Sequence, residues 1–224
     1  MYTSLGMKIT CKAVHTMKKG KKGAFIAFEG LDGSGKTTQF NAIRDKLTQR
    51  KIKCKEEKEP SDRNFIGLMI RGIIKEARGL TVSPVSLAKL FSVDRYEHVV
   101  NDIKPHIDRG GHVLIDRFIF SSFAYQGLDC PFDEIYFYNR DVINLMMPDL
   151  TVFIDTDPKV CLRRINNTRV GKELFDSKGI AVRENSFEAF DRLKDTAKVL
   201  VIDGNQPAEV ITDEIWKAVE PLFV

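Results

Sequence analysis

Short apolar runs alternate with longer amphipathic segments along the chain from residue 24 onward. The short runs have the length of strands, and the longer segments have the spacing of helices that cover a sheet. The predicted strands span 24–28, 51–57, 112–116, 150–155 and 198–203. Because strands and helices alternate, the pattern predicts an α/β fold in which a five-stranded parallel sheet lies between two layers of helices.

The amphipathic segments give the expected helices. These begin after Gly35, span 64–78, 84–109, 118–126, 132–146 and 181–195, and begin again at Pro158 and Pro207. Proline fits badly inside a regular helix, so the helix over 84–109 is predicted to bend or end near Pro105. The segment 166–179 is polar and contains two glycines, and we predict that it is a mobile surface segment.

The size and composition of the chain predict one domain after a short extension. With 224 residues, of which 43% are hydrophobic and 29% charged, the chain can bury a sizeable core without disulfides. Residues 1–22 are interpreted as a basic, mobile extension, and residues 23–224 as the domain. The six lysines of residues 1–28, where no acidic residue occurs, more than account for the formal net charge of +4. Binding to nucleic acid is therefore not expected.

Cysteine usage and hydropathy indicate a cytoplasmic protein. The four cysteines, at positions 11, 54, 130 and 161, form no C-x-x-C pair and have no histidine at metal-ligand spacing. We interpret them as reduced thiols. No segment reaches the ~20 apolar residues of a membrane span, and the leading segment lacks the apolar stretch of a signal peptide. Neither membrane insertion nor secretion is expected.

One motif carries specific chemistry. Residues 30–37, GLDGSGKT, fit the phosphate-binding pattern G-x-x-x-x-G-K-[ST] and lie between a predicted strand and a predicted helix. Glycines let backbone N–H groups approach phosphate oxygens, and the helix presents its positive end to the same charge. Lys36 is expected to hold the β- and γ-phosphates of ATP, and Thr37 to bind Mg²⁺. The predicted ATP-binding residues are Gly30, Asp32, Gly33, Ser34, Gly35, Lys36, Thr37 and Thr38.

The phosphate loop alone does not separate ATPases, GTPases and kinases. GTPases usually add an N-K-x-D motif that reads guanine, and this sequence has none. Hydrolytic motor ATPases usually have longer chains, so the length favours a small kinase.

Four motifs taken together resemble the thymidylate kinase family. They are FEGLDGSGKTTQ at 28–39, Glu59-Pro60 with Gly67 and Arg71 downstream, FSVDR at 91–95, and DRF at 116–118 followed by SSFAYQG at 121–127. The resemblance covers about residues 24–220. It implies the P-loop nucleoside monophosphate kinase fold, phosphoryl transfer from Mg-ATP to dTMP in dTTP biosynthesis, and a homodimer.

The resemblance also indicates which residues contact the sugar and the phosphate of the acceptor nucleotide. Asp32 occupies the position that accepts a hydrogen bond from the 3′-hydroxyl, and Tyr125 lies by the sugar, where its ring would disfavour a 2′-hydroxyl. Arg71 is expected to bind the monophosphate, with Glu59 near Mg²⁺ or its waters. Arg63 competes with Arg71 for this phosphate, because the turn is one residue longer than the common bacterial form.

The base is assigned to two pairs of residues with helical spacing. Phe91 and Arg95 are four residues apart and share a helix face, so the ring can stack on thymine while the guanidinium donates to a carbonyl oxygen. Ser122 and Gln126 have the same spacing and match family positions that contact the pyrimidine ring.

Phosphoryl transfer requires cations that meet the charge of the transferring group. Asp116, at the carboxyl end of a strand, is expected to bind or orient Mg²⁺, and Arg117 to bridge the two substrates' phosphates. Because position 33 is a glycine, the resemblance places a further catalytic arginine in a lid at about 166–179. Arg169 is preferred there, and the alternatives are Arg163, Arg164 and Lys172.

Two other functions fit parts of this sequence. A kinase for another pyrimidine nucleotide or for a deoxynucleoside would share the phosphate loop. A nucleotide-binding scaffold without turnover would also keep the loop, and the unusual lid sequence makes that alternative conceivable.

Overall fold

The computed structural model describes residues 22–75, 82–168 and 178–223. Five strands form one parallel sheet in the order β2-β3-β1-β4-β5, which confirms the predicted α/β fold. Nearly all of the predicted extension and most of the predicted lid lie outside the described residues. Within the described ranges, no helix combines the length and apolar character needed to span a bilayer.

The strands are β1 Phe25–Gly30, β2 Cys54–Lys58, β3 His112–Asp116, β4 Leu150–Asp155 and β5 Val199–Asp203. Every residue of β1 is buried, because Phe25 and Ala27 face one layer of helices while Ile26 and Phe28 face the other. A central parallel strand covered on both faces reads as a continuous apolar run, as this segment does. The edge strand β2 begins three residues later than predicted, and only one of its residues is buried.

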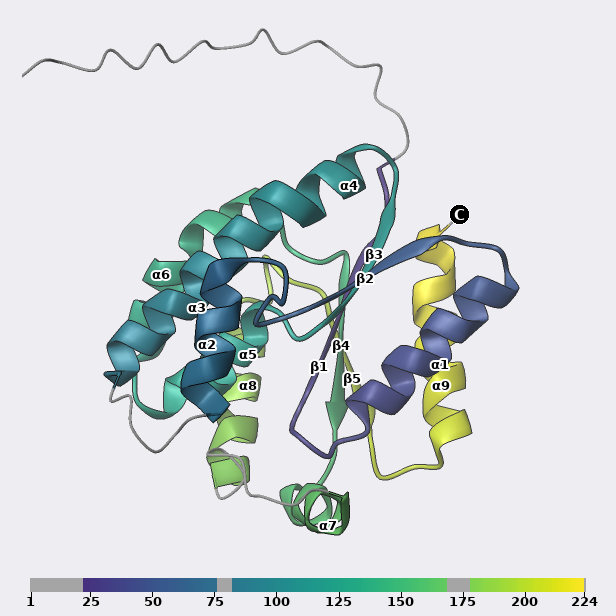
Figure 1. Ribbon diagram of the computed structural model, residues 1–224. Helices are drawn as coiled ribbons and strands as arrows, with labels where there is room; N and C mark the ends of the chain where they lie inside the picture. Colours follow the sequence, from purple (N-terminus) through teal and green to yellow (C-terminus); the bar gives the residue numbers. More distant parts are fainter. Residues whose placement is uncertain (1–21, 76–81, 169–177, 224) are drawn as a thin grey trace, which may run out of the picture.

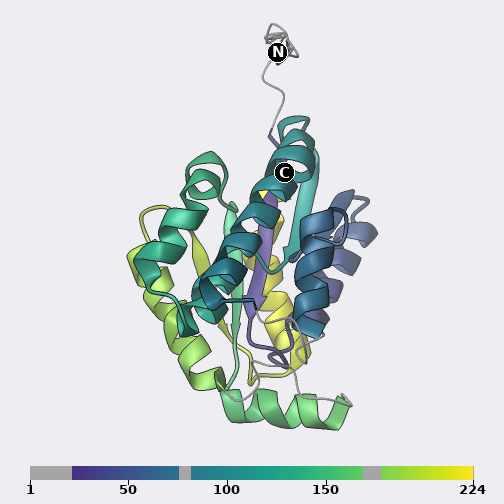
Figure 2. The ribbon, with the colours of Figure 1, turned by 60° about the vertical axis from the view of Figure 1, so that its left-hand side comes forward.

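Two layers of helices cover the sheet (Figure 1). Helices α1 Lys36–Gln49 and α9 Ala208–Val219 pack on one face. The other face is covered by α3 Pro84–His98, α5 Ile119–Tyr125, α6 Phe132–Leu145 and α8 Gly179–Arg192. Helix α2 Phe65–Lys75 contacts α3, and α7 Pro158–Thr168 lies beyond the carboxyl ends of the strands (Figure 2). The short segments η2 Gln126–Leu128 and η4 Glu220–Phe223 are 3₁₀-helical.

The predicted helix over 84–109 changes its winding before Pro105. After α3, residues Val99–Ile103 form the π-helix η1, in which the N–H of Lys104 bonds the carbonyl of Val99, and α4 Lys104–Asp108 follows. Pro105 lies in the first turn of α4, and because it has no N–H it cannot continue the hydrogen-bond ladder that arrives from η1. The predicted irregularity is therefore a π-helical turn.

Strand register brings the predicted site residues together. Asp116 at the end of β3 lies beside Phe28 in β1 and Lys58 in β2. The segments that leave these three strands are therefore neighbours, and they are the phosphate loop, the Glu59-Pro60 turn and the Arg117 turn. In open parallel sheets this edge is where ligands bind.

Candidate active site

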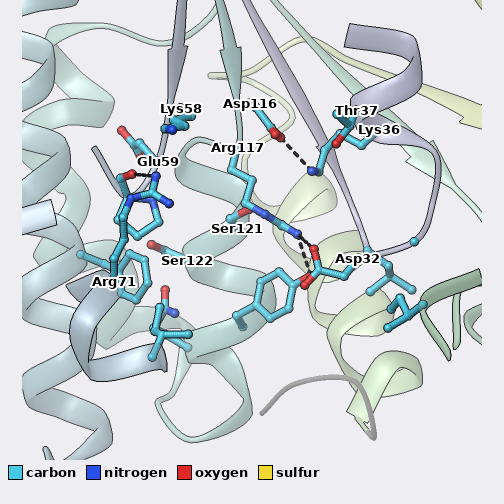
Figure 3. A pocket seen from close by; sticks show the side chains of 18 of the residues that line it. Asp32, Lys36, Thr37, Lys58, Glu59, Arg71, Asp116, Arg117, Ser121 and Ser122 are labelled. Atoms are coloured by element: carbon cyan, nitrogen blue, oxygen red, sulfur yellow. Dashed lines mark hydrogen bonds and ion pairs between the residues drawn. The ribbon is translucent and has the colours of Figure 1, made fainter. Parts of the chain in front are cut away.

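A cavity of about 670 Å³ opens at the carboxyl ends of β1, β2 and β3 (Figure 3). Its volume is typical of a site for a small molecule. The predicted site residues that line it are Asp32, Gly33, Gly35, Lys36, Thr37, Thr38, Glu59, Arg71, Phe91, Arg95, Asp116, Arg117, Ser122, Tyr125 and Gln126. Gly30 and Ser34 belong to the same loop but do not line the cavity, and Arg169 lies outside the described residues.

The phosphate loop joins β1 to α1, as predicted. Gly33 and Gly35 have φ angles of 78° and 99°, a left-handed conformation that favours glycine. The side chain of Lys36 is buried, and its Nζ lies 2.7 Å from Oδ1 of Asp116. Burial and the charge of Arg117 lower the pKa of Lys36. Phosphate oxygens bound beside Lys36 would favour its charged form.

Arg117 lies at the centre of the charged groups in the cavity. Its φ of 66° is uncommon for a residue other than glycine. The guanidinium pairs with Asp32, and its Nη2 lies 3.2 Å from the hydroxyl of Tyr125. Burial raises the pKa of Tyr125 to about 12, so this hydroxyl stays protonated at neutral pH. In Figure 3, Arg117 lies between the phosphate-loop residues on one side and Glu59 and Arg71, which bond to different partners, on the other.

A buried carboxylate that the sequence analysis missed holds the Arg117 turn. Oε1 of Glu29 accepts from the N–H groups of Phe118 at 2.9 Å and Ser121 at 3.0 Å, and Oε2 accepts from the Ser121 hydroxyl at 2.6 Å. Burial raises the pKa of Glu29, and these hydrogen bonds and the charge of Arg117 oppose the rise. The available signal was an acidic residue inside a wholly apolar strand, because such a residue needs buried partners.

Arg95 is fully buried and makes four hydrogen bonds. Nε donates to Oε2 of Glu59 at 2.7 Å, and Nη1 donates to Ser122 Oγ at 2.9 Å and Asn139 Oδ1 at 2.5 Å. Nη2 donates to the carbonyl of Phe118 at 3.2 Å. A guanidinium has five N–H groups, so one N–H on Nη2 has no partner among the described residues. Arg95 lines the cavity, and this N–H is the one left for a ligand.

Gln126 offers the complementary group. Its Oε1 is buried and accepts no hydrogen bond from any described residue. Such an acceptor costs about 1–3 kcal/mol when it stays unpaired, so a ligand with a donor at this point would bind favourably. Phe91 is half-buried and lines the same cavity.

The turn after β2 separates the two arginines that compete for the acceptor phosphate. Arg71 donates to the carbonyl of Pro60 and lines the cavity. Arg63 does not line it, and its Nε lies 3.1 Å from Oε2 of Glu57. The structure therefore places Arg71, and not Arg63, at the cavity.

Among the lid candidates, Arg164 reaches the phosphate loop. Its Nη1 donates to the carbonyls of Gly33 at 3.3 Å and Ser34 at 3.2 Å, and it lines the cavity. Arg163 is exposed on the same helix. The preferred candidate, Arg169, and the alternative Lys172 lie outside the described residues, so the choice of Arg169 stays a prediction.

The predicted magnesium ligands, Thr37 and Asp116, both line the cavity. Over the described ranges, no group of three or more histidine, cysteine or acidic side chains is placed to hold a metal ion. One hydroxyl and one carboxylate are hard oxygen donors, which suits a Mg²⁺ ion that takes its other ligands from phosphates and water.

A phosphate loop, a parallel sheet of this order and a second cavity wall rich in arginine define a P-loop phosphotransferase of the nucleoside monophosphate kinase type. The sequence profile described as "Thymidylate kinase" matches residues 28–215. The chain belongs to the thymidylate kinase family.

Curated relatives agree over nearly the whole chain. It is 35% identical to the thymidylate kinase of Clostridium novyi over 204 residues, which are 87% of this chain and 97% of that protein. It is 34% identical to that of Oceanobacillus iheyensis, over 88% of this chain and 89% of the relative. With that of Anoxybacillus flavithermus the identity is 32%, over 89% and 97%.

Proposed function

We propose that this chain is an ATP-dependent dTMP kinase, which transfers the γ-phosphoryl group of ATP to dTMP and releases ADP and dTDP. Family membership supports this reaction. The observation that carries the choice of base is the pairing of one available donor on Arg95 with one unpaired acceptor on Gln126.

These two groups match the edge of thymine. Thymine presents O4 as an acceptor and N3–H as a donor, so Arg95 donates to O4 and Gln126 accepts from N3–H. Cytosine presents an amino donor and a bare N3 acceptor at the same atoms, and it would face donor with donor and acceptor with acceptor. Phe91, on the wall of this part of the cavity, supplies the ring that stacks on the base.

The remaining groups handle sugar and phosphates. Arg71 binds the acceptor monophosphate, Lys36 holds the donor phosphates, and Arg117 bridges the two. Asp32 accepts from the 3′-hydroxyl once the nucleotide enters beside its present partner, Arg117. The attacking phosphate oxygen is already ionised, so positioning and charge neutralisation supply the catalysis without a general base.

Thr37 and Asp116 would hold Mg²⁺, which neutralises charge on the ATP phosphates when bound. Asp116 can serve because the ion pair with Lys36 engages its Oδ1, and its Oδ2 is the oxygen that would bind the ion. Glu59 is committed to Arg95, so we propose that it orients this arginine and does not bind the ion.

An ADP-release assay over dTMP, dUMP, dCMP, dGMP and thymidine tests the proposal. We expect dTMP to be the best substrate. Loss of one methyl in dUMP should lower kcat/KM by about 10–200-fold. The mismatched edge of dCMP should cost more than about 30-fold, because each of two buried groups loses about 1–3 kcal/mol.

The other two substrates test the limits of the site. Guanine offers the same acceptor and donor on a larger base, so dGMP reports on the size of the pocket. Thymidine lacks the phosphate that Arg71 binds and should be inactive. Activity on thymidine with none on dTMP would contradict the proposal.

Lys36→Ala separates catalysis from simple binding. We expect kcat to fall by about 10² or more, because a cation aimed at the transferring phosphates is lost. Circular dichroism should show the fold intact. Lys46→Ala is the matched control, because Lys46 also lies in α1 but pairs with Asp213 of α9 and does not line the cavity. Unchanged dTDP formation in Lys36→Ala would exclude catalysis at this loop.

We also propose a cytoplasmic homodimer. Large apolar side chains are exposed on α2, α3 and α6, and they include Phe65, Leu68, Val93, Tyr96 and Phe137. Pairing of this face between two copies would cover them. Free thiols at Cys54, Cys130 and Cys161 fit a reducing compartment. Analytical ultracentrifugation tests the dimer, and a monomer at micromolar concentration would contradict it.

A further inference from the structure

A buried cluster of charges lies behind Arg95, between β2 and α3. The imidazole of His98, the last residue of α3, is fully buried. Its Nε2 lies 3.1 Å from Oε2 of Glu57, and its Nδ1 lies 3.7 Å from Oε1 of Glu59. Both glutamates are themselves buried. No motif discussed above accounts for a histidine between two buried carboxylates.

The cluster connects directly to the base-reading group. Glu59 faces His98 with one carboxylate oxygen and accepts from Nε of Arg95, at 2.7 Å, with the other. We propose that His98 is a positioning residue for base recognition, which fixes the carboxylate of Glu59 and through it the guanidinium of Arg95. The inference rests on the proposed function, in which Arg95 donates to thymine.

Charge alternates along this chain of contacts. Lys55 Nζ lies 2.7 Å from Oε1 of Glu57, and Arg63 Nε lies 3.1 Å from Oε2, the oxygen that His98 also contacts. A cationic His98 then separates two carboxylates that would otherwise repel each other at low dielectric. Burial by itself lowers the pKa of His98, but the two glutamates outweigh burial and raise the pKa to about 9. The histidine is therefore charged at neutral pH.

The backbone holds His98 and Arg95 in a fixed relation. The two residues are three apart in α3, so their side chains share one face. The π-helix η1 begins at the next residue, and its Val99 and Ile103 are anchored in the core. A π-helical turn is rare and is found frequently at functional sites. Here it ends regular α-helical winding at the residue that contacts both carboxylates.

The proposal predicts a selective defect when His98 loses its charge. Without the cation, Glu59 has no fixed partner on one oxygen, and Arg95 can turn its single available N–H away from the base. Binding of dTMP should weaken, whereas ATP, which is held by the phosphate loop, should bind as before. A variant that was merely less stable or partly misfolded would bind both dTMP and ATP more weakly.

Steady-state kinetics on His98→Gln measure this defect. The variant keeps a neutral N–H toward Glu57 and removes the charge. We expect KM for dTMP to rise by about tenfold or more, the loss of one charge-assisted hydrogen bond, with KM for ATP within about twofold of wild type. His112→Gln is the matched control, because His112 begins β3 at the opposite end of the sheet. It should leave both KM values unchanged.

A double-mutant cycle links the defect to Arg95. Arg95→Lys should raise KM for dTMP by itself, and His98→Gln should add little to Arg95→Lys if both act through one guanidinium. Fully additive effects on KM would overturn the proposal, because they would mean that His98 acts elsewhere.

A pH series provides a second readout. The charged groups that face this cluster are Lys55, Glu57 and Glu59 on β2 or directly after it, Arg63 in the following turn, Asp94 and Arg95 on α3, and Asp102 on η1. The ratio of KM for dTMP between His98→Gln and wild type should stay constant from pH 7 to 8, about a unit below the titration of His98. It should fall toward one as pH rises through about 9, because wild-type His98 then becomes neutral. A ratio that does not change with pH would count against the cationic role.

Glu57→Gln provides a second test of the proposal if His98→Gln does not fold. It alters the far partner of His98 and leaves the imidazole in place, and we expect a several-fold rise in KM for dTMP alone. If wild type phosphorylates dTMP but both variants match it, the positioning role fails and the dTMP kinase function stands. If wild type does not act on dTMP, the proposed function itself fails.

Discussion

Buried polar side chains around the cavity fall into two kinds, according to whether the protein itself satisfies them. Both oxygens of Glu29 accept hydrogen bonds from residues of the Arg117 turn, so this carboxylate stabilises the conformation of that turn. Gln126 Oε1 has no partner among the described residues, so this amide is prepared for a ligand. Buried polar groups in folded proteins are normally paired, and an unpaired one at a cavity wall indicates binding.

Glu29→Ala tests whether this carboxylate stabilises the Arg117 turn. Removal of the carboxylate leaves two buried N–H groups without partners, which should lower the free energy of unfolding by about 1–3 kcal/mol or more. It also frees Arg117 from its left-handed conformation, so kcat should fall together with stability. Urea denaturation and steady-state kinetics measure the two effects.

Glu56→Ala is the control for Glu29→Ala. Glu56 lies in the edge strand β2 and is exposed, and its ion pair with Arg44 spans 3.6 Å. An exposed pair of this kind contributes about 0–1 kcal/mol. Equal losses in the two variants would show that the three buried hydrogen bonds of Glu29 have no special role.

At the scale of elements, α7 contacts the phosphate loop directly. A Cβ at Gly33 would lie 2.5 Å from the carbonyl oxygen of Cys161 in α7, so no larger side chain fits there unless the helix moves. An arginine at position 33 is thereby excluded in this arrangement. We therefore expect the further cation to come from α7 or from the segment after it.

Arg164→Ala and Arg169→Ala distinguish the two sources. Replacing the arginine that meets the transferring phosphoryl group should lower kcat by about 10²–10³-fold, with little change in KM for dTMP. Replacing the other arginine should change kcat only slightly. Arg163→Ala serves as the control, because Arg163 is exposed on α7. We expect the large effect at Arg169. A large effect at Arg164 alone would move the catalytic role to the helix that contacts the loop.

At the scale of the whole molecule, the sheet separates two apolar cores, and the charged cluster of His98 lies at its β2 edge. The pKa of His98 rises from 6.5 to about 9 on folding. This contribution to stability is complete below pH 6.5 and is lost as pH rises through about 9. Burial opposes ionisation of Glu57, but its bonds to His98 and Lys55 lower its pKa to about 2, so its contribution is lost only as pH falls toward 2.

Stability as a function of pH should follow from these two groups. The free energy of unfolding of wild type should decrease by on the order of 2–3 kcal/mol between pH 6.5 and 9, and this decrease should be absent in His98→Gln. Urea denaturation at half-unit intervals of pH measures it. Parallel curves for the two proteins would contradict the assignment of charge to His98.

The sequence predicts the fold well because the sheet is built from contiguous apolar runs, and β1 shows why: both of its faces are covered. It predicts the cavity residues because the phosphate loop, Glu59 and Arg117 directly follow strands, and because Phe91 and Arg95 share one helix face. The contacts of Glu29 and His98 were not predictable, since they join residues 89 and 41 positions apart. A lone acidic or histidine residue has no periodic pattern. Only the folded chain brings Glu29 of β1 to the turn after β3, and His98 of α3 to Glu57 of β2.

The open acceptor on Gln126 also limits which inhibitors can succeed. A molecule that fills the cavity without a donor at this oxygen keeps the acceptor away from water and forfeits about 1–3 kcal/mol, or roughly 5- to 150-fold in affinity. At the phosphate-binding end of the cavity, by contrast, an inhibitor gains affinity from negative charge, and that charge hinders its entry into cells. A neutral compound with an N–H beside a carbonyl, stacked on Phe91, would draw its selectivity from the buried end of the pocket.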